Sequence, residues 1–169
     1  MSSSLFNPTP SVILSDEQLE FIVEQVNHAM LIKPRCWGSV KRIVVGENVD
    51  MANTLFNTSS GMIVIGDNVF FGHNACVITG THDYRKKGAE RWHAVPESGR
   101  DIYIGAGTWV ASGVTILGPC TIGENAVIAA NSVVTGGDLP GGYIYAGAPA
   151  KAIKKIDFYD ETPPAPEAK

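Results

Sequence analysis

Four histidines are the side chains best suited to move a proton near neutral pH: His28, His73, His82 and His93. A free imidazole titrates at a pH of about 6.5, so its neutral form can accept a proton from an attacking hydroxyl or amine. His82 differs from the others because it ends the segment 79–82 and is followed by the basic run 85–87. The sequence makes His82 the first candidate for general-base chemistry, and the pattern around it must explain how it is positioned.

The three cysteines, Cys36, Cys76 and Cys120, are an odd number at wide spacing and form no Cys-x-x-Cys motif. Such spacing favours neither a metal site nor a redox pair. We expect three buried thiols that behave as small apolar side chains, in a protein of the cytoplasm.

Composition restricts the class of protein. A net charge of −4 and a pI of about 5.5 argue against a nucleic-acid partner. No apolar run approaches the roughly 18 residues that cross a membrane, and segment 1–11 lacks the basic and apolar parts of a signal peptide. The length of 169 residues, 44% of them hydrophobic, fits one domain with a real core.

A six-residue apolar period dominates the chain. Its members are Val45 and Met51, then Ile65, Phe71 and Val77, then Ile104, Val110, Ile116, Ile122, Ile128 and Val134. Six residues are too few for a helical repeat, and turns interrupt any strict alternation. The pattern is typical of a β-solenoid in which each hexapeptide forms one flat side.

A longer period of 18 residues indicates that three sides close one coil. An apolar-Gly-acidic-Asn turn recurs at Val45, Ile65 and Ile122, with a variant at Ile104. Gly and Asn tolerate the positive φ that such corners require. Beside the large apolar residues we expect small ones to fill the corners: Ala75, Thr108, Val114, Cys120, Ala126 and Ser132.

Departures from this period predict where the chain leaves the solenoid. The step from Val45 to Ile65 exceeds one coil by two residues, which predicts a bulge near 59–61. The step from Ile65 to Ile104 predicts an inserted loop over about 83–103. Long loops on rigid scaffolds often carry function, and His82 stands where this one begins.

The ends of the chain follow other patterns. In the N-terminal segment 1–42, Ser15 and Gln18 have capping-box spacing, and apolar residues at three- and four-residue intervals predict a helix over about 15–32. We expect this helix to pack on the solenoid or on a neighbouring subunit. The solenoid domain is expected over 43–156 with a non-repeat C-terminal cap, and the acidic, proline-bearing 157–169 as a disordered tail.

Taken in order, these features resemble the hexapeptide-repeat acyltransferase superfamily, above all galactoside and maltose O-acetyltransferases and the O-acetyltransferases of polysaccharide synthesis. The resemblance covers residues 43–156 and is most specific at Thr-Gly-Thr-His 79–82, at 107–113 and at the closing segment 145–151. It implies a left-handed parallel β-helix, although ordinary parallel crossovers are right-handed. It also implies a homotrimer with active sites between subunits, acetyl-CoA as acyl donor, a saccharide acceptor and no required metal.

The resemblance assigns roles to individual residues. In that superfamily the histidine at the end of the coil before the long loop is the catalytic base, the position of His82. A backbone N–H at Ser112 would stabilise the oxyanion. Asn53 and Asn57, one coil earlier, are candidates to orient the acceptor. Two loop residues, Arg85 and Trp92, are candidates for acceptor contacts, although solvation of the loop accounts for its basic residues equally well.

The positions that match those around CoA in the superfamily are Trp109, Ser112, Gly113, Ala130, Thr135 and Lys151. Small residues at Gly113 and Ala130 would let the pantetheine arm approach the backbone, or would simply fit a narrow solenoid. The chain departs from the family after Thr135, where a Lys commonly follows and this sequence has Gly136. One phosphate contact is therefore in doubt.

Three alternatives to sugar O-acetylation stay open. N-acetylation of an amino sugar, a nucleotide-linked amino sugar or an antibiotic would use the same base. A hydratase of the γ-carbonic-anhydrase type shares the solenoid but needs three histidines on zinc, two of them closely spaced; here His73, His82 and His93 are 9 and 11 residues apart. The third alternative is a non-catalytic solenoid scaffold.

Overall fold

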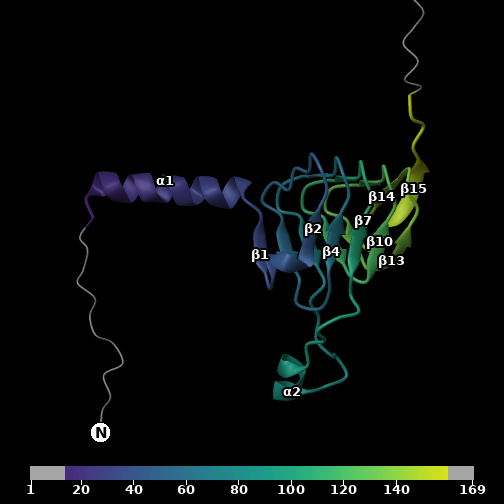
Figure 1. The fold of residues 1–169 in the computed structure, drawn as a ribbon, viewed down its shortest axis with the longest axis horizontal. Helices are drawn as coiled ribbons and strands as arrows, with labels where there is room; N and C mark the ends of the chain where they lie inside the picture. Colours follow the sequence, from purple (N-terminus) through teal and green to yellow (C-terminus); the bar gives the residue numbers. More distant parts are fainter. Residues whose placement is uncertain (1–13, 160–169) are drawn as a thin grey trace, which may run out of the picture.

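The structure is a computed structural model that describes residues 14–159. It is a left-handed parallel β-helix in which three sheets of five strands form the sides of a prism, as predicted (Figure 1). Sheet A contains β1 (Arg35–Trp37), β3 (Leu55–Asn57), β6 (Cys76–Ile78), β9 (Thr115–Leu117) and β12 (Val133–Val134). Sheet B contains β2 (Ile43–Val45), β4 (Ile63–Ile65), β7 (Ile102–Ile104), β10 (Cys120–Ile122) and β13 (Gly137–Leu139). Sheet C contains β5 (Phe70–Phe71), β8 (Trp109–Val110), β11 (Val127–Ile128), β14 (Tyr143–Ala146) and β15 (Lys151–Lys155).

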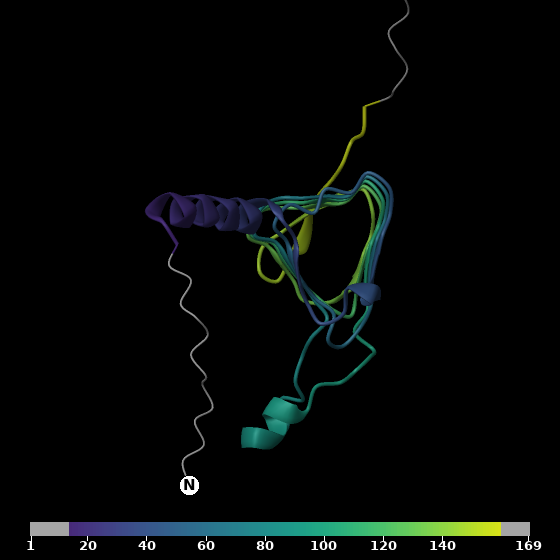
Figure 2. The same ribbon diagram turned by 60° about the vertical axis from the view of Figure 1, so that its left-hand side comes forward.

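The chain visits the sheets in the order A, B, C, and each junction is named here as the AB, BC or CA corner. Figure 2 shows the triangular section that results. The repeated turn motifs lie at one corner, because Val45, Ile65, Ile104 and Ile122 are register partners on adjacent strands of sheet B. The 18-residue period in the sequence therefore corresponds to one complete coil of the solenoid.

Apolar side chains fill the prism. Phe56, Val77 and Ile116 stack along sheet A, and each is at most 1% exposed. All six small residues expected in the corners are buried: Ala75, Thr108, Val114, Cys120, Ala126 and Ser132. Close packing of one large and one small residue per side explains why the sequence keeps a strict period.

Left-handed backbone positions mark two of the corners. The BC corner carries positive φ at Asn48, Asn68, Gly107 and Asn125. The CA corner carries it at Asn74, Gly113 and Asn131. Asn and Gly adopt this conformation at little cost, so one such residue per coil turns the chain there.

Extra chain leaves the prism at the AB corner instead. In a regular coil, the inward residue of a sheet A strand and that of the next sheet B strand are six residues apart, as are Ile116 and Ile122. The corresponding steps are longer from Phe56 to Ile65 and from Val77 to Ile104. The first excess includes the bulge predicted near 59–61. The second is a loop over residues 79–101, here called the excursion, which contains α2 (Gly88–His93). The predicted bounds are 83–103. The loop begins earlier because β6 ends at Ile78, and it ends earlier because the buried Ile102 already belongs to β7.

The N-terminal helix is α1 (Asp16–Ile32), and its capping box between Ser15 and Gln18 is present as the spacing predicted. None of its residues is buried, and it stands off the first coil (Figure 1). Its apolar stripe therefore does not pack on its own solenoid, which leaves the other expectation, a neighbouring subunit, as the open one. A short 3-10 turn over Val40–Arg42 precedes β2.

Strand β15 pairs antiparallel with β14 and forms the C-terminal cap. The predicted disordered tail 157–169 and the segment 1–11 fall largely outside the described residues. Within residues 14–159, no helix combines the length and the apolar character needed to cross a bilayer.

The cysteines differ from the expectation of three buried thiols. Cys120 is 4% exposed inside the prism, whereas Cys36 on the open first coil and Cys76 on the outer face of sheet A are partly exposed. Burial first, and then the charge of Asp138, raises the pKa of the Cys120 thiol to about 11.

A consequence can be measured by alkylation. Because only the thiolate reacts, iodoacetamide should leave Cys120 unlabelled in the folded protein at a pH of about 8, and labelling should begin only as the pH rises toward 11. Peptide mass spectrometry reports each thiol separately, and unfolding in guanidinium is the control that should expose Cys120. Fast labelling of Cys120 in the folded protein at the lower pH contradicts this account.

Candidate active site

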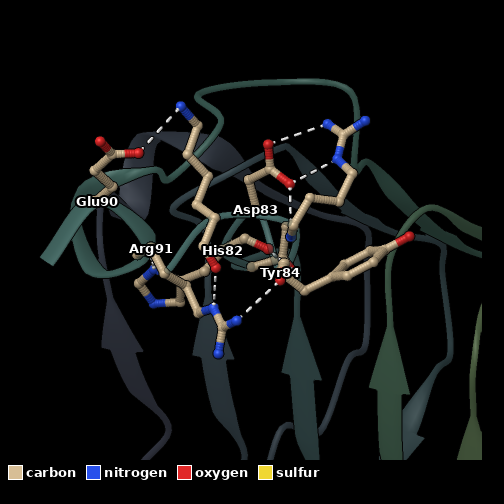
Figure 3. Close-up of polar contacts among 8 residues, drawn as sticks. His82, Asp83, Tyr84, Glu90 and Arg91 are labelled. Atoms are coloured by element: carbon tan, nitrogen blue, oxygen red, sulfur yellow. Dashed lines mark hydrogen bonds and ion pairs between the residues drawn. The ribbon is translucent and has the colours of Figure 1, made fainter. Parts of the chain in front are cut away.

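His82 lies at the base of the excursion and is exposed. Its Nδ1 is 3.0 Å from the backbone carbonyl oxygen of Arg91 (Figure 3). A carbonyl can only accept a hydrogen bond, so this contact assigns the ring proton of the neutral imidazole to Nδ1. Nε2 then keeps its lone pair, which is the state that a general base needs.

Backbone and side-chain hydrogen bonds close the excursion on itself, and one from Arg42 joins it to the prism. The N–H of Asp83 donates to the carbonyl of Ala94 at 2.9 Å and closes its neck. Arg100 Nε donates to the carbonyl of Thr79 at 2.8 Å, and Arg42 Nη1 donates to the carbonyl of Glu97 at 2.9 Å. His82 is thus held on a braced loop, although its side chain is open to solvent.

A pocket of about 500 Å³ opens beside His82. Its lining residues are Thr81, His82, Asp83, Tyr84, Arg85, His93, Ala94, Val95, Pro96 and Arg100. Arg85 Nε lies 2.8 Å from Asp83 Oδ1, and this hydrogen bond holds the pKa of the Asp83 carboxyl below its usual range. Imidazole, guanidinium, carboxylate and phenol groups suited to a polar, hydroxylated ligand therefore line one space.

The other predicted acceptor residues lie at different distances from this pocket. Asn57 is the last residue of β3, and its amide lies so close to Gly80 of the excursion that a side chain at Gly80 would collide with it. Trp92 is 73% exposed on α2, where its ring stacks on His93 at 5.2 Å and does not line the pocket. Asn53 is 3% exposed at the CA corner, where its amide exchanges hydrogen bonds with Asn74. These bonds hold Asn53 away from the His82 of its own chain.

The residues predicted to bind CoA gather elsewhere. Ser112, Gly113 and Ala130 lie at the CA corner on adjacent coils, and Trp109 and Lys151 lie on sheet C. Trp109 is 45% exposed and stacks on Phe70 at 5.8 Å. Thr135 is apart from this group, because it follows β12 at the AB corner.

Ser112 has one backbone donor to spare. Its Oγ accepts the N–H of His73 at 3.1 Å, and its carbonyl accepts the N–H of Asn131 at 3.0 Å. Within residues 14–159, the Ser112 N–H makes no hydrogen bond. An unpaired backbone N–H is the type of group that stabilises an oxyanion.

A single chain does not bring His82 and Ser112 together. The excursion leaves the AB corner, whereas Ser112 lies at the CA corner, so the width of sheet A separates them (Figure 2). Sequence reasoning also missed the contacts of Arg91, Tyr84 and Arg100, since the excursion has no period that reveals which side chains meet. For the zinc alternative, residues 14–159 hold no group of three His, Cys, Asp or Glu side chains close enough to share a metal ion.

Comparison of the sequence with known proteins identifies its relatives. The model of the bacterial transferase hexapeptide family (six repeats) matches residues 101–136. The galactoside O-acetyltransferase of Escherichia coli is 31% identical over 158 residues, which cover 90% of this chain and 74% of that protein. The chain spans 59% of the length of a Saccharomyces cerevisiae relative that is 37% identical over 124 residues.

Solved structures agree with the sequence relatives. A maltose O-acetyltransferase from Clostridium difficile superposes with a TM-score of 0.61 at 32% identity, covering 87% of this chain and 80% of that one. A galactoside acetyltransferase in complex with coenzyme A gives a TM-score of 0.65 at 27% identity, covering 85% and 74%. The triangular coil and the relatives in sequence and in structure indicate the same family. The chain belongs to the hexapeptide-repeat acyltransferase superfamily.

Proposed function

We propose that this protein transfers the acetyl group of acetyl-CoA to a hydroxyl of a saccharide, with His82 as the general base. The observation that carries the proposal is the 3.0 Å contact between His82 Nδ1 and the Arg91 carbonyl oxygen beside an open polar pocket. It leaves Nε2 unprotonated and accessible. Relatives named galactoside and maltose O-acetyltransferases support the choice of a sugar hydroxyl.

The transfer is a direct displacement. His82 Nε2 takes the acceptor proton as the hydroxyl oxygen attacks the thioester carbonyl carbon, which forms a tetrahedral oxyanion. Collapse of the oxyanion breaks the C–S bond, and the protonated imidazole returns its proton to the CoA thiolate. The products are an acetyl ester and free CoA thiol, so atoms and charges balance without a covalent enzyme intermediate.

The donor side of the reaction falls to the CA corner. Ser112 offers its unpaired N–H to the oxyanion, and exposed Ala130 leaves the backbone open to a pantetheine arm. A galactoside acetyltransferase of this fold has been solved with coenzyme A, which supports CoA chemistry for the fold. Trp109, Gly113 and Lys151 complete the donor side. Thr135 lies at the AB corner and does not join these residues within one chain.

The acceptor side falls to the excursion and its pocket. Arg85 lines the pocket and Asn57 lies against Gly80 at its base. Trp92 offers an exposed ring on which a sugar face can stack. Asn53 lies at the CA corner, where its amide bonds to Asn74, so it would reach this acceptor side only from a neighbouring subunit.

The separation of the two sides supports a homotrimer with sites between subunits. If His82 of one copy faces the CA corner of a neighbour, each site needs two chains. This predicts complementation between two inactive variants, His82→Ala and Ala130→Trp, where the indole fills the exposed position on the donor side. Co-expression should restore activity that neither variant has alone.

Two differently tagged copies, purified through both tags in sequence, provide the mixed oligomers for this assay. Mixtures of separately purified variants, assayed before subunits exchange, are the control and should stay inactive. Absence of recovery in doubly tagged oligomers would show that the two sides do not combine across chains.

The proposed activity is tested by the release of CoA thiol from acetyl-CoA with a panel of galactosides, maltose and other saccharides. A saccharide-dependent release whose product carries a base-labile acetyl ester is the expected result. Release only with amino sugars, giving base-stable amides, overturns the hydroxyl acceptor in favour of N-acetylation. No release with any acceptor overturns the transferase assignment for this panel and its donor.

A further inference from the structure

Arg91 holds three points of the excursion at once. Its backbone carbonyl accepts the hydrogen bond from His82 Nδ1 at 3.0 Å. Its Nε donates to the carbonyl of Lys86 at 2.7 Å, and its Nη2 donates to the carbonyl of Tyr84 at 3.1 Å. Figure 3 shows this fork of guanidinium bonds next to the imidazole ring.

The helix that carries Arg91 has little else to fix it. Helix α2 is six residues long and buries none of its side chains, and helices this short are unstable by themselves in water. Its remaining polar link to the 84–86 segment is an exposed ion pair, in which Lys86 Nζ lies 3.8 Å from Glu90, and such pairs contribute little. At its C-terminal end, α2 is also held by the backbone bond from the Asp83 N–H to the carbonyl of its C-cap, Ala94, at 2.9 Å. The two guanidinium bonds are therefore the main side-chain tie between α2 and the 84–86 segment.

We propose that Arg91 is a positioning residue that sets the tautomer of His82, an inference that rests on His82 being the base of the proposed function. The guanidinium fixes α2 against the carbonyls of Tyr84 and Lys86. The fixed helix holds the Arg91 carbonyl in place to accept the Nδ1 proton, which leaves Nε2 free for the acceptor. Without the fork, the carbonyl moves and the proton redistributes between Nδ1 and Nε2.

The test compares Arg91→Ala and Arg91→Lys with a matched control, Lys87→Ala, which removes an exposed cation from the N-cap of the same helix. Imidazole ¹⁵N NMR of the neutral His82 ring reads the tautomer directly, assigned by its loss in His82→Ala. We expect Nδ1–H in the native protein and in the control, and a mixture with Nε2–H in both Arg91 variants. Lysine should not rescue, because one ammonium cannot reproduce the planar fork to two carbonyls.

Kinetics provide the second measurement. Loss of the hydrogen-bond partner that orients a metal-bound histidine typically costs about 10–100-fold in affinity or activity, and we take that range as the guide for an oriented catalytic histidine. We therefore expect kcat of Arg91→Ala to fall about tenfold, at the low end of that range, with little change in KM for acetyl-CoA, since Arg91 is not among the residues proposed to hold CoA. A fall in kcat with the tautomer unchanged, or neither change, overturns the positioning role. A tautomer shift with kcat unchanged supports the positioning role and instead overturns His82 as the base.

Discussion

Replacement of His82 by alanine should lower kcat for acetyl transfer by about 10²–10⁴-fold, the usual worth of general-base assistance. The variant loses the Nε2 that accepts the acceptor proton but should fold normally, because the imidazole is exposed and makes a single hydrogen bond. Its KM for acetyl-CoA should stay close to the native value, since His82 takes part in proton transfer and is not among the residues proposed to hold CoA. Steady-state release of CoA thiol and a thermal melt measure the two effects separately.

The matched control for this prediction is His28→Ala. His28 is an exposed histidine on α1, outside both sides of the proposed site. It should keep native kcat and KM. Retention of most of the activity in His82→Ala would instead mean that another group, or solvent, takes the proton, and the role assigned to the excursion would have to be given up.

Replacement of Ile116 by alanine should cost about 2–5 kcal/mol in free energy of unfolding, the range for removal of a large buried aliphatic side chain. Ile116 is fully buried, between Val77 and Val134 on the neighbouring coils of sheet A. A cavity at this position removes packing contacts with both neighbouring coils, and in a solenoid each coil is stabilised mainly by its nearest neighbours. Urea unfolding followed by circular dichroism measures the loss.

Thr121→Ala serves as the comparison for Ile116→Ala. Thr121 is exposed on the outer face of β10, and surface changes of this kind usually stay within about 0.5 kcal/mol. Equal stability of the two variants would mean that the interior relaxes around the missing side chain or that the unfolding transition is not cooperative. The strict six-residue period would then lose its energetic explanation.

The solenoid could be predicted from sequence because each side repeats the same packing problem. Ile104, Ile116 and Ile122 each meet aliphatic neighbours one coil away, so one rule applies many times. The corner residues add a second, independent pattern through the positive φ of Asn68 and Asn125. Local sequence and three-dimensional contact agree at every coil, and the register follows from counting.

The site could be predicted only in part. His82 is a candidate because the repeat stops beside it, but its contact with Arg91 spans nine residues of aperiodic loop that no pattern describes. Asn53 shows a second limit: its distance of one coil from the loop suggested an acceptor role, and its hydrogen bonds with Asn74 hold it at the CA corner, away from His82 of the same chain. Counting places a residue along the chain, but it does not tell which corner its side chain serves.

The bulge near 59–61 and the excursion both leave the prism at the AB corner, and the coil beyond closes over the gap. The N–H of Gly118 donates to the carbonyl of Ile78, and the N–H of Cys120 to the carbonyl of Asp101, both at 3.0 Å. Neither bond depends on how many residues lie between Ile78 and Asp101. A scaffold of this kind can therefore accept a longer, shorter or different segment beyond His82 without any change in the coils on either side of it.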